Sequence, residues 1–203
     1  MLKTEKNDIL KNFYRNLSHQ DLYSLIDARG DINREIYIDT ITPQVANRIE
    51  KVIRFWNSID DDSTVEVMNR QPIKIYINSK GGLLEAAFTI IDAIKLSKTP
   101  VYTINTGTVS KEAFYIFLAG INRFSYPRAS FFYKREESFY GIMEDEANYE
   151  AFYQKQMEEL KQMILEKTKI SEQEYDKKST MWFTAEQAYE NKICTEVLRS
   201  RTL

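Results

Sequence analysis

Two glycine-bearing junctions between a predicted strand and a predicted helix carry the residues with the clearest chemical potential. The first is Asn78-Ser79-Lys80-Gly81-Gly82, and the second runs from Thr106 through Gly107 to Glu112. Both follow the carboxyl ends of successive strands, the edge of an open α/β sheet at which ligands bind. Glycine lets the backbone turn an N–H group toward a cavity, and two such donors beside a helix N-terminus can hold an oxyanion. The same glycines also serve simply to join strand to helix, so the spacing alone leaves both interpretations open.

The chain of 203 residues contains one histidine, His19, and one cysteine, Cys194. A single His and a single Cys cannot build the ligand shells that zinc prefers, so we expect neither a metal nor another cofactor. A disulfide within the chain is also excluded. His19 precedes the first predicted strand, and we expect it to be solvated or to lie at a helix end.

Charge and hydropathy exclude several partners. The net charge of -2 and the pI near 5.7 give no basic surface for nucleic acid. The longest uncharged apolar stretch, Ala113 to Asn122, has about half of the ~20 residues that a membrane span needs. The N-terminus carries charges where a signal peptide requires an apolar core, at Lys3, Glu5, Lys6 and Asp8. We therefore expect a cytoplasmic protein, which suits an unpaired cysteine.

Strand and helix signals alternate along the chain and predict an α/β fold with a parallel sheet. Strands are indicated by alternating apolar residues and helices by apolar residues at helical spacing. The expected strands lie at 35–39, 73–77, 101–106, around Phe124 and Phe131, and at 193–198. The expected helices lie within 1–30, after the Thr42-Pro43 cap, at 84–94, 112–119 and 145–169, and after the capping boxes Ser171/Glu174 and Thr184/Gln187.

Two units are expected: an N-terminal helical extension over 1–30 and one domain over 31–203. The acidic run from Asp60 to Asp62, continuing to Arg70, is interpreted as a solvated loop. Two helices carry an apolar stripe that needs a partner. The stripes are Ile9, Leu10, Phe13, Tyr14 and Leu17 in the first helix, and Tyr149, Tyr153, Met157, Leu160 and Ile164 in the long helix at 145–169.

Six short motifs in this order resemble the proteolytic subunit of the Clp protease, the ClpP family of the crotonase-like superfamily. They are Asn78-Ser79-x-Gly81-Gly82, Asp92-Ala93-Ile94, Gly107-x-Val109-x-x-x-Ala113, the segments 116–120 (IFLAG) and 126–131 (YPRASF), and 183–190 (FTAEQAYE). The resemblance covers roughly Glu35 to Leu198. It implies a spiral of βαβ units and rings of seven identical subunits that stack through a protruding "handle" helix, a role that residues 145–169 would fill.

The resemblance also implies a Ser-His-Asp triad, and here the sequence departs from the family. The nucleophile position is Lys111, the base position is Lys134 and the Asp position is Thr180. A Ser–His mechanism needs a neutral imidazole, and the only one, His19, lies outside the similar region. An ordinary lysine is protonated at neutral pH and is a poor base. The sequence therefore predicts a pseudopeptidase with no catalytic residues, a scaffold for ring assembly, in which the backbone of Gly82 and Glu112 keeps the oxyanion hole.

Two alternatives remain open. A lysine whose pKa is lowered by burial or by a second cation can activate a serine, so Ser110 and Lys134 are a candidate nucleophile and base for an active ClpP-like endopeptidase. A crotonase-type acyl-CoA enzyme is the remote alternative, because that superfamily shares the fold and the paired N–H groups. The expected partners are further copies of this chain, and an active ClpP paralogue or an ATPase, with neither nucleic acid nor membrane.

Overall fold

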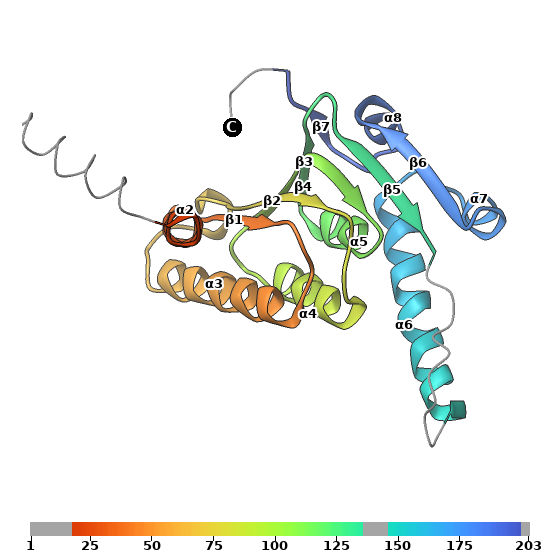
Figure 1. The fold of residues 1–203 in the computed structure, drawn as a ribbon, viewed down its shortest axis with the longest axis horizontal. Coiled ribbons are helices and arrows are strands. Elements are labelled where there is room, and N and C mark those ends of the chain that lie inside the picture. Colours follow the sequence, from red (N-terminus) through yellow and green to blue (C-terminus); the bar gives the residue numbers. More distant parts are fainter. Residues whose placement is uncertain (1–17, 136–145, 200–203) are drawn as a thin grey trace, which may run out of the picture.

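The computed structural model describes residues 18–135 and 146–199 and confirms an α/β fold built on a parallel sheet. Five strands run parallel in the order β1-β2-β3-β4-β7 (Figure 1). They are β1 Glu35–Ile38, β2 Ile73–Ser79, β3 Val101–Ser110, β4 Asn122–Ser125 and β7 Glu196–Val197. The alternating isoleucines of β2, Ile73, Ile75 and Ile77, are fully buried, as their spacing predicts.

The third strand changes partner along its length. Residues 102–105 of β3 pair with β4, and residues 108–110 pair with β5 (Ser130–Lys134). β5 in turn pairs antiparallel with β6 (Thr180–Thr184), so an arm of two strands leaves the main sheet at this point. The sequence pattern ended the third strand at Thr106 and gave no sign of β6, whereas the structure extends β3 to Ser110.

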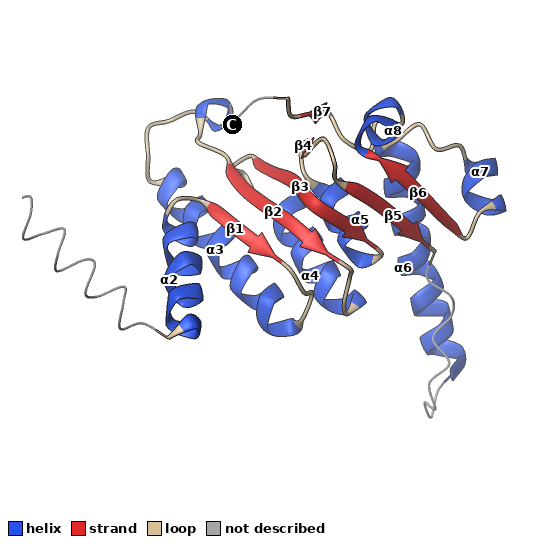
Figure 2. Ribbon diagram, turned by 45° about the horizontal axis from the view of Figure 1, so that its top comes forward, coloured by secondary structure: helices blue, strands red, loops and turns tan. Residues whose placement is uncertain are grey.

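Helices α3 (Pro43–Asp61) and α4 (Leu84–Lys95) cover one face of the sheet (Figure 2). The predicted cap of α3 is present, because the Thr42 hydroxyl accepts the Val45 N–H at 3.3 Å and Pro43 takes the first helical position. Helix α5 (Glu112–Ala119) contacts β3, α4 and α6, and all eight of its residues are buried. The site-bearing turn before α5 is therefore anchored in the core.

The long helix α6 spans Glu146–Lys167, close to the expected 145–169, and its first half projects from the body (Figure 1). Its second half joins the core through Leu160, Met163 and Ile164, whereas Phe152 in the projecting half is 56% exposed. The short helices α7 (Glu172–Lys177) and α8 (Ala185–Glu190) start at the expected caps, Ser171 and Thr184. The last strand is shorter than expected and covers only Glu196–Val197.

The interpretation of the acidic run as a solvated loop is wrong for its first residues. Helix α3 continues to Asp61, and Asp60 is buried in an ion pair with Arg34. The guanidinium of Arg34 donates to both carboxylate oxygens at 2.6 and 2.7 Å, and the Thr99 hydroxyl donates at 2.6 Å. Arg34 and Thr99 lie 26 and 39 residues from Asp60 in the sequence, so a local pattern of charges cannot reveal these contacts. The rest of the run includes a 3-10 turn over Val67–Asn69.

The helix expected within residues 1–30 falls partly outside the described residues, because its apolar stripe from Ile9 to Leu17 precedes residue 18. Helix α2 (His19–Ile32) lies beside β1. The division into a helical extension over 1–30 and a domain over 31–203 stays a prediction. In the part of the chain that the structure describes, no helix combines the length and the apolar character needed to cross a membrane.

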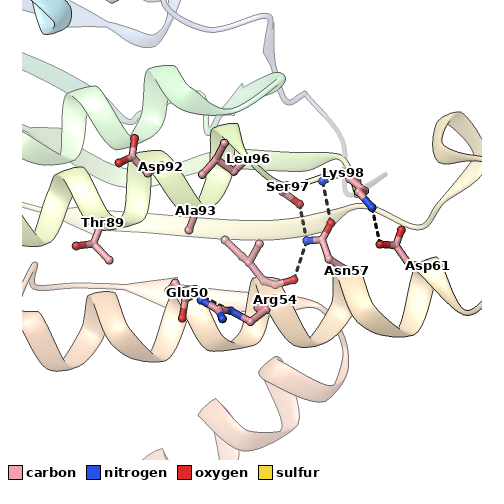
Figure 3. A pocket seen from close by; sticks show the side chains of 11 residues that line it. Glu50, Arg54, Asn57, Asp61, Thr89, Asp92, Ala93, Leu96, Ser97 and Lys98 are labelled. Atoms are coloured by element: carbon pink, nitrogen blue, oxygen red, sulfur yellow. Dashed lines mark hydrogen bonds and ion pairs between the residues drawn. The ribbon is translucent and has the colours of Figure 1, made fainter.

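A hollow of about 490 Å³ lies between α3 and α4 (Figure 3). The polar groups on its wall bind one another: the amide of Asn57 donates to the Ser97 hydroxyl at 2.8 Å and accepts the Lys98 N–H at 2.8 Å, while the Lys98 ammonium pairs with Asp61. These groups tie α3 to the turn that follows α4, and none of the candidate site residues lines the hollow.

Candidate active site

The turn between β3 and α5 holds Lys111 in a backbone conformation that lysine rarely adopts. Its φ is 53° and its ψ is -121°. A non-glycine residue at positive φ costs of the order of 1–3 kcal/mol and persists only where the surroundings impose it. A sharp, strained strand-to-helix turn of this kind is the geometry that exposes a nucleophile in hydrolases. Lys111 is exposed, and its N–H donates to the Phe132 carbonyl at 2.9 Å, which fixes the turn against β5.

Two asparagine side chains help to shape the strands that lead into this turn. The register between β2 and β3 shifts between Ile77 and Ser79. There the Asn78 carbonyl oxygen accepts the Thr108 N–H at 3.0 Å, and that of Asn105 accepts the Gly107 N–H at 3.0 Å. These side chains supply acceptors where the regular ladder is interrupted, so β3 can continue past Gly107 to meet β5.

The three positions that the sequence analysis assigned to a triad converge on one corner of the molecule. Lys134 at the end of β5 is the direct antiparallel partner of Thr180 at the start of β6. Phe132, two residues before Lys134 on β5, accepts the hydrogen bond from Lys111. The side chains at this corner are thus two lysines and a threonine. His19 is the first residue of α2, which lies beside β1 at the far edge of the sheet (Figure 2).

The alternative nucleophile, Ser110, is placed differently. It is the last residue of β3, its Cα pairs with that of Phe132, and it is only 6% exposed. Its neighbour Lys111 is exposed, as expected for successive residues at a strand end that point in different directions. The described residues include no hydrogen bond between the Ser110 hydroxyl and the Lys134 ammonium, the contact that a Ser–Lys dyad requires.

The turn expected to form the oxyanion hole is filled by a side chain. Gly82 donates its N–H to Oε2 of Glu112 at 2.8 Å, and Glu112 is only 5% exposed. Gly81 has a φ of 109°, and a Cβ at this position would collide with the same carboxylate. The carboxylate therefore occupies the glycine turn and takes the N–H donor that the sequence assigned to a substrate oxyanion.

Sequence reasoning used Glu112 only for its backbone N–H and missed the role of its side chain. Glu112 is the first residue of α5, where the helix dipole favours a negative charge. A charged residue in a helix that is otherwise wholly apolar was the available signal. Its path into the turn depends on the missing Cβ of Gly81, which lies 31 positions earlier and is brought close only by the fold.

Comparisons with known proteins agree with this architecture. The protein-family model of the Clp protease matches residues 19–201. The ATP-dependent Clp protease proteolytic subunit 2 of Borreliella burgdorferi is 34% identical over 137 residues, which cover 65% of this chain and 69% of the relative. The subunit of the same name from Treponema denticola is 26% identical over 204 residues, which cover 98% of this chain and 90% of the relative.

A solved structure supports the same assignment. A mutant of ClpP1 from Listeria monocytogenes superposes with a TM-score of 0.70 at 27% identity, covering 87% of this chain and 97% of the solved one. The family model spans almost the entire chain, and the long helix, the branching third strand and the two glycine turns all fall within it. The chain therefore belongs to the Clp protease family.

Proposed function

We propose that this chain is a Clp-type subunit that does not hydrolyse peptides and acts as a scaffold within a larger assembly. The observation that carries the proposal is the hydrogen bond from the Gly82 N–H to the buried Glu112 carboxylate. Acyl transfer requires such a donor to be free for the oxyanion that develops in the transition state. A substrate carbonyl would have to displace a charged acceptor that is already bound there, so the donor contributes nothing to catalysis.

The strained turn supports the same proposal. The exposed position at the turn carries Lys111, whose ammonium has no lone pair to attack a carbonyl. The base position carries Lys134, and the residue paired with it, Thr180, cannot orient a base as a carboxylate does. The occupied glycine turn weighs equally against the acyl-CoA alternative, which also depends on two free N–H donors.

A fluorogenic peptide and a fluorophosphonate probe test the proposal, with an active Clp subunit assayed alongside. We expect no peptide turnover and no covalent labelling of this chain. Turnover that disappears in Ser110→Ala would overturn the proposal and favour the Ser–Lys alternative. In that case Lys134→Met should also abolish turnover, because no other lysine is placed on β5 to serve as the base.

The proposal includes self-assembly and partner subunits. The projecting half of α6 exposes Phe152, as expected of a helix that meets another copy of the chain. The names of the matched relatives, ATP-dependent proteolytic subunits numbered 2, support an active Clp subunit and an ATPase as partners. Co-purification of the tagged chain with an active Clp subunit from the same cells tests this part. Recovery of the tagged chain alone, while the active subunit assembles without it, would contradict it.

A further inference from the structure

Three lysines lie around the corner where Lys111, Lys134 and Thr180 meet, and no described residue forms an ion pair with any of them. A Cβ on Gly81 would lie 3.1 Å from the Lys111 Cβ, so Lys80, the residue before Gly81, belongs to the same corner. Lys80 and Lys111 are exposed, and Lys134 is half-buried. Within residues 18–135 and 146–199, none of the three forms an ion pair.

Two carboxylates close to this corner, among the residues that the structure describes, are already engaged. Glu112 is buried and turned toward the Gly82 N–H, and Asp176 on α7 pairs with Lys161 at 3.1 Å. Arg135, which follows Lys134, is also engaged, because it donates to the Tyr175 carbonyl at 3.2 Å and lies over the Tyr175 ring. Among the described residues, the corner therefore carries the positive charges of Lys80, Lys111 and Lys134 without a paired carboxylate, next to the charge of Arg135, and such a group of like charges favours an anionic partner.

An aromatic pair adjoins Lys134 on the outward face of the β5–β6 arm. Phe131, Tyr133 and Met181 point into the core, so the alternate residues of both strands point outward. The outward residues include Lys134 and Phe132, and Trp182 stacks on Phe132 with ring centroids 4.2 Å apart. Trp182 remains 67% exposed. The face thus combines unpaired cations with an apolar surface, the combination that suits an amphipathic polypeptide better than a small inorganic anion.

We infer that this face binds an extended acidic polypeptide segment and holds it without cleaving it. Lys80, Lys111 and Lys134 would pair with its carboxylates, and the Phe132–Trp182 stack would take an adjacent apolar side chain. The inference rests on the proposed function, since the loss of hydrolysis is what turns the corner into a binding site. Two lysines at the expected nucleophile and base positions would then do more than remove catalysis. Their charge would make the site select an acidic ligand.

Fluorescence anisotropy with a fluorescein-labelled peptide rich in glutamate and leucine measures this binding directly. Two matched peptides, with every glutamate replaced by glutamine or by lysine, serve as probes of charge. We expect the acidic peptide to bind, the other two to bind much more weakly, and affinity to fall with added salt. The Lys111→Met/Lys134→Met variant should bind the acidic peptide about tenfold more weakly, through the loss of two charge pairs.

The matched control is Lys51→Met/Lys95→Met, which removes the same charge from exposed positions on α3 and α4. It should bind like the unaltered chain, and circular dichroism checks that both double variants fold. Lys134→Glu should shift the preference toward the lysine peptide. Absence of acidic-peptide binding, equal binding of the glutamine peptide, or an unchanged affinity in Lys111→Met/Lys134→Met would each overturn the inference.

Two further readouts separate the inference from the proposed function. Acrylamide quenching should show that the acidic peptide shields the exposed Trp182, and this change should vanish in Trp182→Phe, which leaves the half-buried Trp56 as the only tryptophan. Mass spectrometry of the peptide after incubation reports on hydrolysis. Binding with cleavage would contradict the proposed function and the claim that the segment is held intact, whereas no binding and no cleavage would overturn only the inference.

Discussion

Lys111 keeps a strained backbone although a lysine gains nothing chemical from the strain. Its N–H donates to the Phe132 carbonyl, and its own carbonyl accepts the Phe114 N–H at 2.9 Å. Both bonds join backbone atoms, and Phe114 belongs to the buried helix α5. The turn is therefore imposed by β5 and α5 and does not depend on the side chain at position 111. A nucleophile placed there would be exposed on a strained turn already formed.

Because the turn forms whatever side chain stands at position 111, we predict that the peptidase activity of a variant with a restored triad depends on Glu112 as much as on the triad itself. We expect Lys111→Ser/Lys134→His/Thr180→Asp to remain nearly inactive on a fluorogenic peptide, because the Glu112 carboxylate still holds the Gly82 N–H. Adding Glu112→Met should free this donor and raise kcat by about 10²–10³, the usual contribution of one oxyanion donor.

The control for this series is Glu112→Gln on the same triple variant. Glutamine has nearly the same shape and still offers an oxygen to the Gly82 N–H, so activity should stay low. Equal activity of the methionine and glutamine variants would show that the occupied turn is not what limits catalysis. High activity of the triple variant with Glu112 intact would contradict the proposed effect of the carboxylate more directly.

Among the elements, α3 is fastened to the start of β1 by a buried ion pair. Arg34 precedes β1 with a φ of 62°, and its guanidinium lies 4.1 Å from the centre of the Trp56 ring. The same guanidinium donates to both oxygens of Asp60. These hydrogen bonds hold the pKa of the Asp60 carboxyl below its ordinary 3.8 against the opposing effect of burial, and the Thr99 hydroxyl adds to the lowering.

Asp60→Asn should lower the free energy of unfolding by about 3 kcal/mol at neutral pH, because it leaves the buried Arg34 without its counter-charge. Since the folded-state pKa of Asp60 is below the unfolded one, the stabilisation is fully present above pH ~4 and is lost as the pH falls through the folded value. Urea unfolding at neutral pH and at about pH 3 should therefore show the difference between the two proteins shrinking in acid.

Two variants sharpen this test. Asp61→Asn alters the next residue, whose side chain is 39% exposed against 8% for Asp60, and it should have a smaller effect because water can solvate the position. Arg34→Met/Asp60→Leu removes both charges and should cost less than Asp60→Asn alone. An equal loss in Asp60→Asn and Asp61→Asn would mean that the buried pair does not fasten α3 to β1.

The elements also show which features local sequence patterns can predict. The isoleucine alternation of β2 and the Thr42-Pro43 cap are local, and both predicted their elements correctly. Strand β6 was missed because its five residues lie between two short capped helices, and only pairing with β5 makes them a strand. The burial of Asp60 and the path of the Glu112 side chain were missed for the same reason. Asp60 meets Arg34, and Glu112 meets Gly81, only in the folded chain.

Across the whole molecule, the helix that carries the only histidine and the candidate site lie on opposite sides of the sheet. Helix α2, which begins at His19, lies beside β1, and the β5–β6 arm branches from β3 at the other side (Figure 2). Helix α6 lies between the two strands of the arm in the chain, and its first half projects from the described body (Figure 1). The candidate site and the expected assembly surface thus lie on the same side of the sheet.

The two halves of α6 serve different purposes, and two substitutions separate them. Ile164 is fully buried, so Ile164→Ala should lower the free energy of unfolding by about 2–5 kcal/mol through the cavity it leaves. Phe152 is 56% exposed, so Phe152→Asp should leave the secondary structure and the fold of the subunit intact. Circular dichroism and chemical denaturation at low protein concentration compare the two.

Native mass measurement then shows whether α6 joins two rings. For the unaltered chain we expect an assembly of seven or fourteen copies of the 24.0 kDa subunit, because the resemblance implies stacked rings of seven. If the projecting half packs against α6 of a facing ring, a charge at position 152 is buried without a partner, and the assembly should stop at seven copies. Fourteen copies in Phe152→Asp would place the ring-to-ring contact elsewhere, and a monomer of the unaltered chain would remove self-assembly from the proposed function. Because the exposed face of α6 takes no part in the core, a change in mass without a change in subunit stability could arise only from contacts between copies.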